Sequence, residues 1–234
     1  MALSPIVVAS LQAAVISAIS NILAQGLAAR KSSIGKAPLE IDWVPVFQFV
    51  LFAFISTPPN FLWQDFLESS FPAYHVSPTS EAIISASAGN ERDLDDEATQ
   101  GRLVEPKLNK RNTLIKTLLD QTVGTAVNTL LFSVFIHSAQ AAMAHRAGAG
   151  FGHPAQSLGF LLSGNAVRYA AVRSDLVWRR ATAEFFDLVK ASWTFWPIIS
   201  IVNFTMLKSV EARNLTGSLA GLGWGVYMSS IAAQ

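Results

Sequence analysis

Long apolar runs without a charged residue recur along the chain. A helix needs about 20 mostly apolar residues to cross the roughly 30 Å hydrocarbon core of a bilayer. Five runs approach that length without Asp, Glu, Lys or Arg, and they cover residues 5–29, 43–64, 121–144, 191–207 and 214–234. The fourth run is the shortest, and glycine makes the fifth less apolar. The pattern predicts four or five membrane-spanning helices, so the number of spans and the orientation of the termini stay open.

The stretch between the third and fourth runs has a different character. Residues 147–167 carry no charge but contain much glycine and proline, so we expect a loop that leads into a helix at about residues 155–182. Basic side chains are mixed there with apolar and aromatic ones: Arg168, Arg173, Arg179 and Arg180 beside Leu161, Leu162, Tyr169, Val172, Leu176 and Trp178. This mixture suits the headgroup region of a bilayer. We predict an interfacial amphipathic helix; the alternative is a solvated helix without lipid contact.

A long polar segment, residues 75–111, separates the second and third runs. It contains the sequence GNERDLDDEATQGR, whose acidic residues are Glu91, Asp93, Asp95, Asp96 and Glu97. Low hydrophobicity and clustered charge favour disorder, because such a segment buries too little apolar surface to offset the entropy lost on ordering. We expect a disordered acidic loop insert, and a partner-docking segment is the alternative.

The composition supports a membrane protein and argues against several other classes. Of the 234 residues, 51% are hydrophobic and 14% are charged, against about 25% charged in an average soluble domain. A net charge of +1 gives no basic footprint for nucleic acid. The chain lacks cysteine, and its four histidines show no tight metal-ligand spacing. We predict an all-α integral membrane bundle that forms a single domain over residues 1–234 and holds no metal.

No pattern of catalytic residues is recognisable in the sequence. The chain has no nucleophile–base pair and no glycine-rich phosphate loop followed by Lys and Ser or Thr. Glu184 and Asp187 lie one helix turn apart, but a solvated interfacial pair explains them better. We therefore predict that the protein is not an enzyme and uses no cofactor.

The third run and the residues just before it carry a polar stripe. Lys116 opens the stripe, and at about 100° per residue the positions that fall within about 100° of arc are Thr117, Asp120, Gln121, Gly124 and Asn128. The candidates are Lys116, Asp120, Gln121 and Asn128. Lys116 and Asp120 are one turn apart and able to pair. Ionisable groups near membrane depth tend to face a bundle interior or a water-filled cavity. The stripe is therefore a candidate pore lining or a set of interhelical hydrogen bonds.

The last two runs carry packing signals. On a helix, Trp193, Trp196, Ser200 and Asn203 lie within about 80° of one another. Pro197 removes a backbone hydrogen bond, so we expect a kinked helix whose polar side is turned from lipid. In the last run, small residues recur every four positions at Gly217, Gly221 and Gly225. Glycines at this spacing let a neighbouring helix approach closely, so these three are predicted packing sites.

Several motifs resemble those of a known family. The sequence WTFWPIISIVNF, residues 193–204, is similar to the signature Trp-x-x-Trp-Pro-x-x-Gln-x-x-Asn-Phe of the Mpv-seventeen and peroxisomal-membrane-protein-twenty-two family. KTLLDQ, residues 116–121, resembles its Lys-x-x-x-Asp-Gln motif, and WGVYMS, residues 224–229, resembles its closing motif. The matching positions of the C-terminal signature region, residues 185–232, are Trp193, Trp196, Pro197, Asn203, Phe204, Arg213, Trp224 and Tyr227. Ser200 replaces a Gln, and the insert at 75–111 indicates a divergent member.

The resemblance implies a small integral protein of the peroxisomal membrane or the mitochondrial inner membrane, usually drawn with four spans. Members of this family are thought to form pores for small solutes and to support organelle homeostasis. The function predicted on this basis is a channel for small solutes or ions, and the alternative is a membrane scaffold or interaction protein without transport activity. The expected partners are the lipid bilayer, small solutes and further copies of the same chain.

Overall fold

The computed structural model of the chain describes residues 3–32, 41–145 and 154–232. Its helices and strands have the following order and bounds: α1 (Pro5–Ser32), α2 (Trp43–Ser70), β1 (Tyr74–Pro78), α3 (Ser80–Ser87), α4 (Glu91–Thr99), β2 (Val104–Leu108), α5 (Lys110–Leu119), η1 (Asp120–Gly124), α6 (Thr125–Ala142), α7 (Pro154–Leu162), η3 (Tyr169–Ala171), α8 (Ser174–Ser192), α9 (Trp196–Met206) and α10 (Val210–Ala232). The expected helical architecture is therefore confirmed, with one small sheet added.

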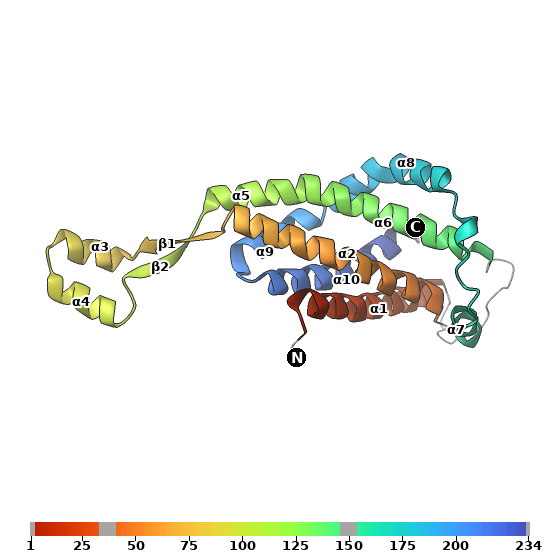
Figure 1. Ribbon diagram of the computed structural model, residues 1–234, viewed down its shortest axis with the longest axis horizontal. Helices are drawn as coiled ribbons and strands as arrows, with labels where there is room; N and C mark the ends of the chain where they lie inside the picture. Colours follow the sequence, from red (N-terminus) through yellow and green to blue (C-terminus); the bar gives the residue numbers. More distant parts are fainter. Residues whose placement is uncertain (1–2, 33–40, 146–153, 233–234) are drawn as a thin grey trace.

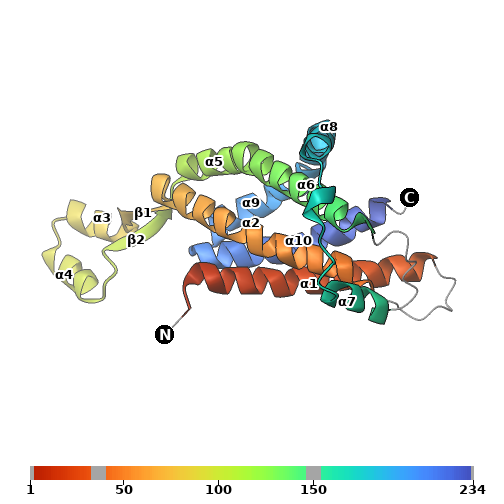
Figure 2. The same ribbon diagram turned by 45° about the vertical axis from the view of Figure 1, so that its right-hand side comes forward.

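The long helices lie roughly along one axis and form an elongated bundle (Figure 1). α1 packs along α2 and α10, α5 contacts α9, and α6 packs against α8. In a turned view, α7 lies near one end of α2 and α8 lies beyond α6 (Figure 2). Because α2 also contacts α6 and α10, it is the central helix of the bundle.

Three apolar helical segments are long enough to cross a membrane among the residues described, namely Pro5–Leu27, Trp43–Ser70 and Lys110–Ala142. The third is continuous through α5, η1 and α6, so it begins 11 residues before the run predicted at 121–144. α8 and α9 together make a further candidate that is bent by 57°. The last run forms α10, but the side chains of its final turns lie outside the described part of the chain, so a fifth span stays a prediction.

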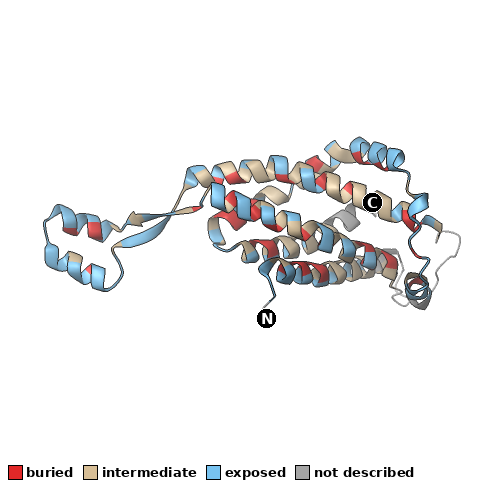
Figure 3. Cartoon of the chain, in the orientation of Figure 1, coloured by how far each residue is buried: buried red, intermediate tan, exposed pale blue. Residues whose placement is uncertain are grey.

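Figure 3 shows the buried and exposed positions along the helices of the bundle. Many of the exposed positions are apolar, and many of the buried ones are polar. Large apolar side chains such as Val15, Phe54 and Leu62 are exposed on its surface. The buried positions are filled largely by small or polar residues, including Ala13, Ala14, Ala53, Gln48, Thr57, Gln64, Ser133 and Ser200. Membrane helices associate through small residues and polar contacts, because lipid supplies no hydrophobic drive between them. This inverted pattern fits a bundle surrounded by lipid.

The fourth predicted span differs from the observed helices. α9 runs only from Trp196 to Met206, which is too short to cross a bilayer alone. Pro197 stands in its first turn, where the missing N–H has no intrahelical partner to lose. The predicted kink is therefore a break before the proline, between α8 and α9, and not a bend inside one helix.

The segment for which disorder was expected forms an arm that projects from the bundle (Figure 1). β1 and β2 pair antiparallel with Tyr74 opposite Leu108, and α3 and α4 lie between them. Thr79 accepts a hydrogen bond from the first turn of α3, and Asn90 accepts one from that of α4. Gly89 and Gly101 adopt φ values of 66° and 65°. Caps and glycine turns order this segment locally, which its average composition did not reveal.

The helix predicted at residues 155–182 is also not continuous. α7 ends at Leu162, and Gly164 follows with a φ of 72°. The short η3 then precedes α8, which begins only at Ser174. The left-handed glycine interrupts the helix, because other residues adopt that conformation only with strain. The basic residues are therefore divided between a loop and the first half of α8.

Candidate functional site

Asp120 lies where α2, η1 and α9 meet. Its Oδ1 accepts hydrogen bonds from Trp63 Nε1 at 3.3 Å and from Gln64 Nε2 at 3.0 Å. Its Oδ2 accepts from Ser200 Oγ at 2.9 Å and from Gln121 Nε2 at 3.2 Å. One carboxylate is thus surrounded by four uncharged donors from three helical segments. These five residues are named the Asp120 cluster below.

The local backbone helps to bring Asp120 and Gln121 together. η1 is a single π-helical turn in which the Thr125 N–H donates to the Asp120 carbonyl. Successive residues on a regular α-helix point about 100° apart. The wider π-helical turn nevertheless brings the consecutive side chains of Asp120 and Gln121 into one cluster. Single π turns inside α-helices occur frequently at functional sites.

Gly124, at the end of this turn, leaves room for the Trp63 indole. A Cβ added at Gly124 would lie 2.9 Å from Trp63 Nε1 and 3.3 Å from Asp120 Oδ1. Both distances are shorter than an ordinary van der Waals contact. Glycine is therefore required here for the indole to reach the carboxylate past the helix backbone.

A second carboxylate cluster lies one helix turn earlier. Lys116 Nζ is 2.6 Å from Glu68 Oε2, and Arg213 Nη1 is 2.5 Å from the same oxygen. Both cationic side chains are 0% exposed. The ring of Phe204 lies 4.9 Å from Lys116 Nζ and 5.4 Å from Arg213 Cζ. Glu68, Lys116 and Arg213 are named the Glu68 triad. The predicted pairing of Lys116 with Asp120 is wrong, because the ammonium reaches the carboxylate at the exit of α2 instead.

The Glu68 triad also fixes three chain junctions. Arg213 Nε donates to the carbonyls of Asn203 at 3.2 Å and Leu207 at 3.0 Å, and Nη2 donates to Leu207 as well. Glu68 Oε1 accepts the Ala73 N–H at 2.9 Å. The triad therefore holds the end of α9, the start of α10 and the exit of α2 at one end of the bundle.

The predicted polar stripe is only partly a unit. Asp120 and Gln121 share one cluster, and Lys116 belongs to the other. Asn128 is exposed on α6 and is in neither cluster. The predicted aromatic and polar face is divided in the same way: Ser200 and Asn203 are buried, whereas Trp193 is half-exposed and donates to the Gln121 carbonyl at 2.8 Å. The division follows from the helix break before Pro197.

The aromatic signature residues form a small group at the start of α9. The Trp196 and Trp224 ring centroids are 6.3 Å apart, and Phe195 lies 5.8 Å from Trp224. These rings join α9 to α10. The side chain of Tyr227 lies outside the residues that the structure describes, so its predicted packing role is not tested.

The three predicted packing glycines differ from one another. A Cβ at Gly225 would meet Ser20 Oγ of α1 at 3.0 Å, which confirms a close helix approach there. A Cβ at Gly217 or Gly221 would meet no atom within 4 Å among the described residues. The predicted packing role of these two glycines therefore stays a prediction.

Glu68, Trp63 and Gln64 are the residues that the polar pattern did not identify. A signal was present, since Lys116 and Arg213 are cations in or beside apolar segments and each needs a nearby acid. Glu68 lies four residues after the end of the second apolar run. The sequence could not show that α2 brings this acid next to both cations.

The chemistry available to these clusters is hydrogen bonding and charge pairing. Within the described part of the chain, no three His, Asp or Glu side chains are grouped as metal ligands are. Each cluster is centred on one carboxylate, and the donors come from helices far apart in sequence. Such a centre can hold helices together, and it can exchange side-chain donors for water when the helices separate.

Comparisons with known proteins agree with this C-terminal architecture. Residues 172–229 match the model of the Mpv17 / PMP22 family. Over 51 residues, or 22% of this chain, the sequence is 39% identical to PXMP2/4 family protein 3 of Dictyostelium discoideum, of which the match covers 27%. No solved structure matches the chain. The matched region contains α8, α9 and most of α10, and with them Ser200 of the Asp120 cluster and Arg213 of the Glu68 triad. Residues 172–229 are therefore similar to the Mpv17 / PMP22 family.

Proposed function

We propose that this protein is a pore of an organellar membrane that passes small hydrophilic solutes or ions. The observation that carries the proposal is the Asp120 carboxylate inside the bundle. Asp120 lies about 15 Å along the helix axis from Lys110, the start of its candidate span. Ionisable residues at such depth are costly, and they often mark ion and solute pathways.

The hydrogen bonds of the Asp120 cluster suggest how such a pore closes. All four donors are neutral side chains, and three of them come from α2 and α9. In the closed bundle they take the place of water around the carboxylate. Separation of α9 from α2 and η1 would let water replace the Ser200 hydroxyl as a donor to Asp120 Oδ2. We propose that this separation is the opening step.

Conductance measurements on the purified full chain in planar bilayers test this proposal. We expect single-channel events with a preference for cations, because the fixed charge in the path is negative. Asp120→Asn should weaken that preference while channels still form. Asp65→Asn is the matched control, because Asp65 is exposed on α2 one residue from Gln64, and its loss should leave selectivity unchanged.

Two results would count against the pore. One is the absence of conductance across a range of voltages and redox conditions from a preparation whose helical content is intact. The other is an equal change of selectivity in both variants, since a general change of surface charge would then explain the effect.

The projecting arm favours a second candidate, a membrane scaffold without transport activity. Residues 74–108 lie away from the bundle, and the tip helix α3 exposes Ile83 and Ile84. The outer part of the arm can be removed without changing the strand register, because Pro78 and Val104 are paired opposite each other in the β1–β2 sheet. Replacing residues 79–103 by Asn-Gly closes a two-residue hairpin. Loss of cellular function with full conductance would favour the scaffold, and retention of both would favour the pore.

The remaining properties follow from the same proposal. We propose location in the peroxisomal membrane or the mitochondrial inner membrane, assembly of several copies and the absence of enzymatic activity. Assembly is included because one bundle, closed around Asp120, is narrow for a solute path. Imaging of a tagged chain against markers of both organelles tests the location.

A further inference from the structure

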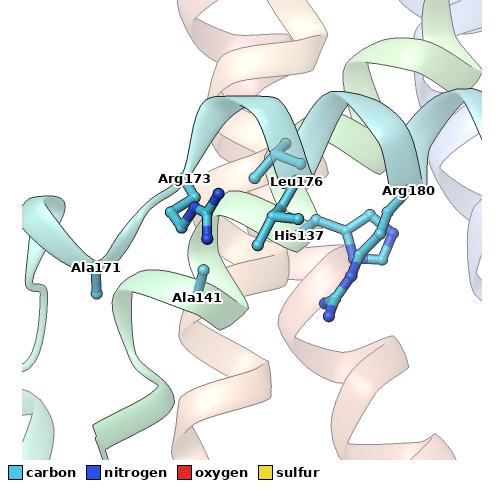
Figure 4. Close-up of a pocket in the computed structure, with 7 residues that line it drawn as sticks. His137, Ala141, Ala171, Arg173, Leu176 and Arg180 are labelled. Carbon is cyan, nitrogen blue, oxygen red and sulfur yellow. The ribbon is translucent and has the colours of Figure 1, made fainter.

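We propose that a cavity between α6 and α8 binds a phosphate group, and that an anionic phospholipid of the surrounding membrane supplies it. The cavity has a volume of about 110 Å³. It is lined by His137, Ala141, Ala171, Arg173, Leu176, Val177 and Arg180 (Figure 4). This inference is independent of the proposed pore, because none of these residues belongs to the Asp120 cluster.

The charge of the cavity favours an anion. Its lining contains two arginines and one histidine and no carboxylate. Arg173 is paired with Asp175 at 2.9 Å, and His137 Nε2 lies 2.9 Å from Glu184 Oε1. Arg180 has no ion-pair partner among the residues that the structure describes. The guanidinium of Arg180 is therefore the arginine head group of the lining that no ion pair of the described residues occupies.

The histidine adds an unused polar position. Nδ1 of His137 is buried and has no hydrogen-bond partner among the described residues. Buried polar atoms in folded proteins are nearly always satisfied by protein or water. Figure 4 shows Arg180 of α8 and Arg173, just before α8, extending towards α6 with Leu176 between them. The planar guanidinium fork is well suited to phosphate oxygens.

The cavity is large enough for a phosphate group but too small for a whole metabolite. Pockets for drug-sized ligands have volumes of about 300–1,000 Å³. A cavity of about 110 Å³ is well below that range. A phosphate headgroup fits this space when the rest of the molecule stays outside. A lipid satisfies that condition, because its acyl chains remain in the bilayer.

The surroundings place the cavity at the level of lipid headgroups. His137 is five residues before the end of the Lys110–Ala142 segment, which is about 7–8 Å along the axis. Trp178 and Tyr169 near the cavity are exposed by 56% and 83%. Exposed Trp and Tyr beside Arg are typical of a membrane–water interface. Basic pockets between membrane helices are known to bind anionic headgroups.

Lipid retention measured by native mass spectrometry tests the proposal. The full chain is purified in detergent, mixed with phosphatidylglycerol or phosphatidylcholine, and partly delipidated. We expect one phosphatidylglycerol to be retained in preference to phosphatidylcholine. Arg180→Gln should lower that retention about tenfold or more, because one charge-assisted hydrogen bond is lost.

The neighbouring arginine supplies the control. Arg179→Gln removes the same charge from the next position of α8, yet Arg179 does not line the cavity. Its effect on retention should be less than about twofold if binding depends on the cavity and not on general attraction to a basic helix. Equal losses in the two variants would overturn the proposal, as would equal retention of both lipids by the wild-type chain.

A filling variant and a soluble anion complete the test. Ala141→Leu adds bulk to the cavity without a change of charge, so it should also reduce retention. If it does not, the anion binds outside the cavity and the proposal fails. Inorganic phosphate distinguishes the source of the phosphate group: displacement of the lipid by millimolar phosphate supports a soluble anion at the same site, and failure to displace it supports the lipid.

Discussion

The Asp120 cluster and the Glu68 triad are neighbours, because Lys116 and Asp120 lie one helix turn apart on the continuous helix of α5 and η1. The two sites nevertheless surround their carboxylates with opposite kinds of partner. In the triad, Glu68 meets two cations that are completely buried at one end of the bundle. In the cluster, Asp120 meets only neutral donors. Loss of the charge on Glu68 leaves two cations buried without a partner. Loss of the charge on Asp120 leaves no buried cation without a partner. The Glu68 triad is therefore suited to stabilising the fold, and the Asp120 cluster to a change of conformation.

The largest expected effect is the loss of charge in the triad. Glu68→Gln should lower the free energy of unfolding by about 3–5 kcal/mol, because it leaves Lys116 and Arg213 buried without an anion. Thermal unfolding in detergent, followed by circular dichroism, measures the change. Glu211→Gln is the control, because Glu211 is exposed on α10. If Glu68→Gln is as stable as this control, the Glu68 triad does not stabilise the fold more than the Asp120 cluster does.

The next effect concerns the space beside Asp120. Gly124→Ala should cost about 1–3 kcal/mol, because the added methyl group meets the Trp63 indole at 2.9 Å. Gly221→Ala is the matched control. It makes the same substitution inside a helix, but the added Cβ would meet no described atom within 4 Å. That variant should be neutral or more stable by up to about 1 kcal/mol. The same unfolding assay compares them, and equal destabilisation would contradict the packing around η1.

A smaller effect is expected for the carboxylate of the cluster itself. Asp120→Asn should change the free energy of unfolding by less than about 1.5 kcal/mol, because the amide oxygen still accepts two donors. Gln121 Oε1 is buried without a partner, so a flip of its amide supplies an acceptor for the new Nδ2. Unfolding of Asp120→Asn measured beside Glu68→Gln compares the two carboxylates directly. A loss as large as that of Glu68→Gln would remove the distinction between them.

The smallest effect is expected at the arm. Replacing residues 79–103 by Asn-Gly should change the unfolding midpoint of the bundle very little. The root of the arm keeps its own anchors, because Tyr74 Oη donates to the Thr205 carbonyl at 2.5 Å and the Asn109 N–H donates to the Ala73 carbonyl at 2.7 Å. Glu68 also keeps its bond to Ala73. A large fall in the midpoint would mean that the triad depends on the intact arm.

The sequence alone predicted the membrane bundle, because a charge-free apolar run of about 20 residues has few other stable environments. It also selected Asp120 and Lys116 as unusual, since ionisable groups near membrane depth tend to face a bundle interior or a water-filled cavity. The resemblance of residues 193–204 to a family signature was likewise readable from order and spacing. Local order in the arm was missed, because the average composition of residues 75–111 outweighed the capping signals of Thr79 and Asn90.

Only the tertiary structure decided which charges meet. Lys116 stands one turn from Asp120, and sequence spacing favours that pair, yet α2 brings Glu68 within 2.6 Å and the ammonium pairs there. The packing partner of each glycine was also undetermined by spacing, because a Cβ at Gly225 would meet Ser20 of α1 whereas a Cβ at Gly217 or Gly221 would meet no described atom within 4 Å. Spacing along one helix fixes the direction of a side chain but not the identity of its neighbour. The neighbour is set by the rotation and approach of other helices, which depend on contacts made over the whole bundle.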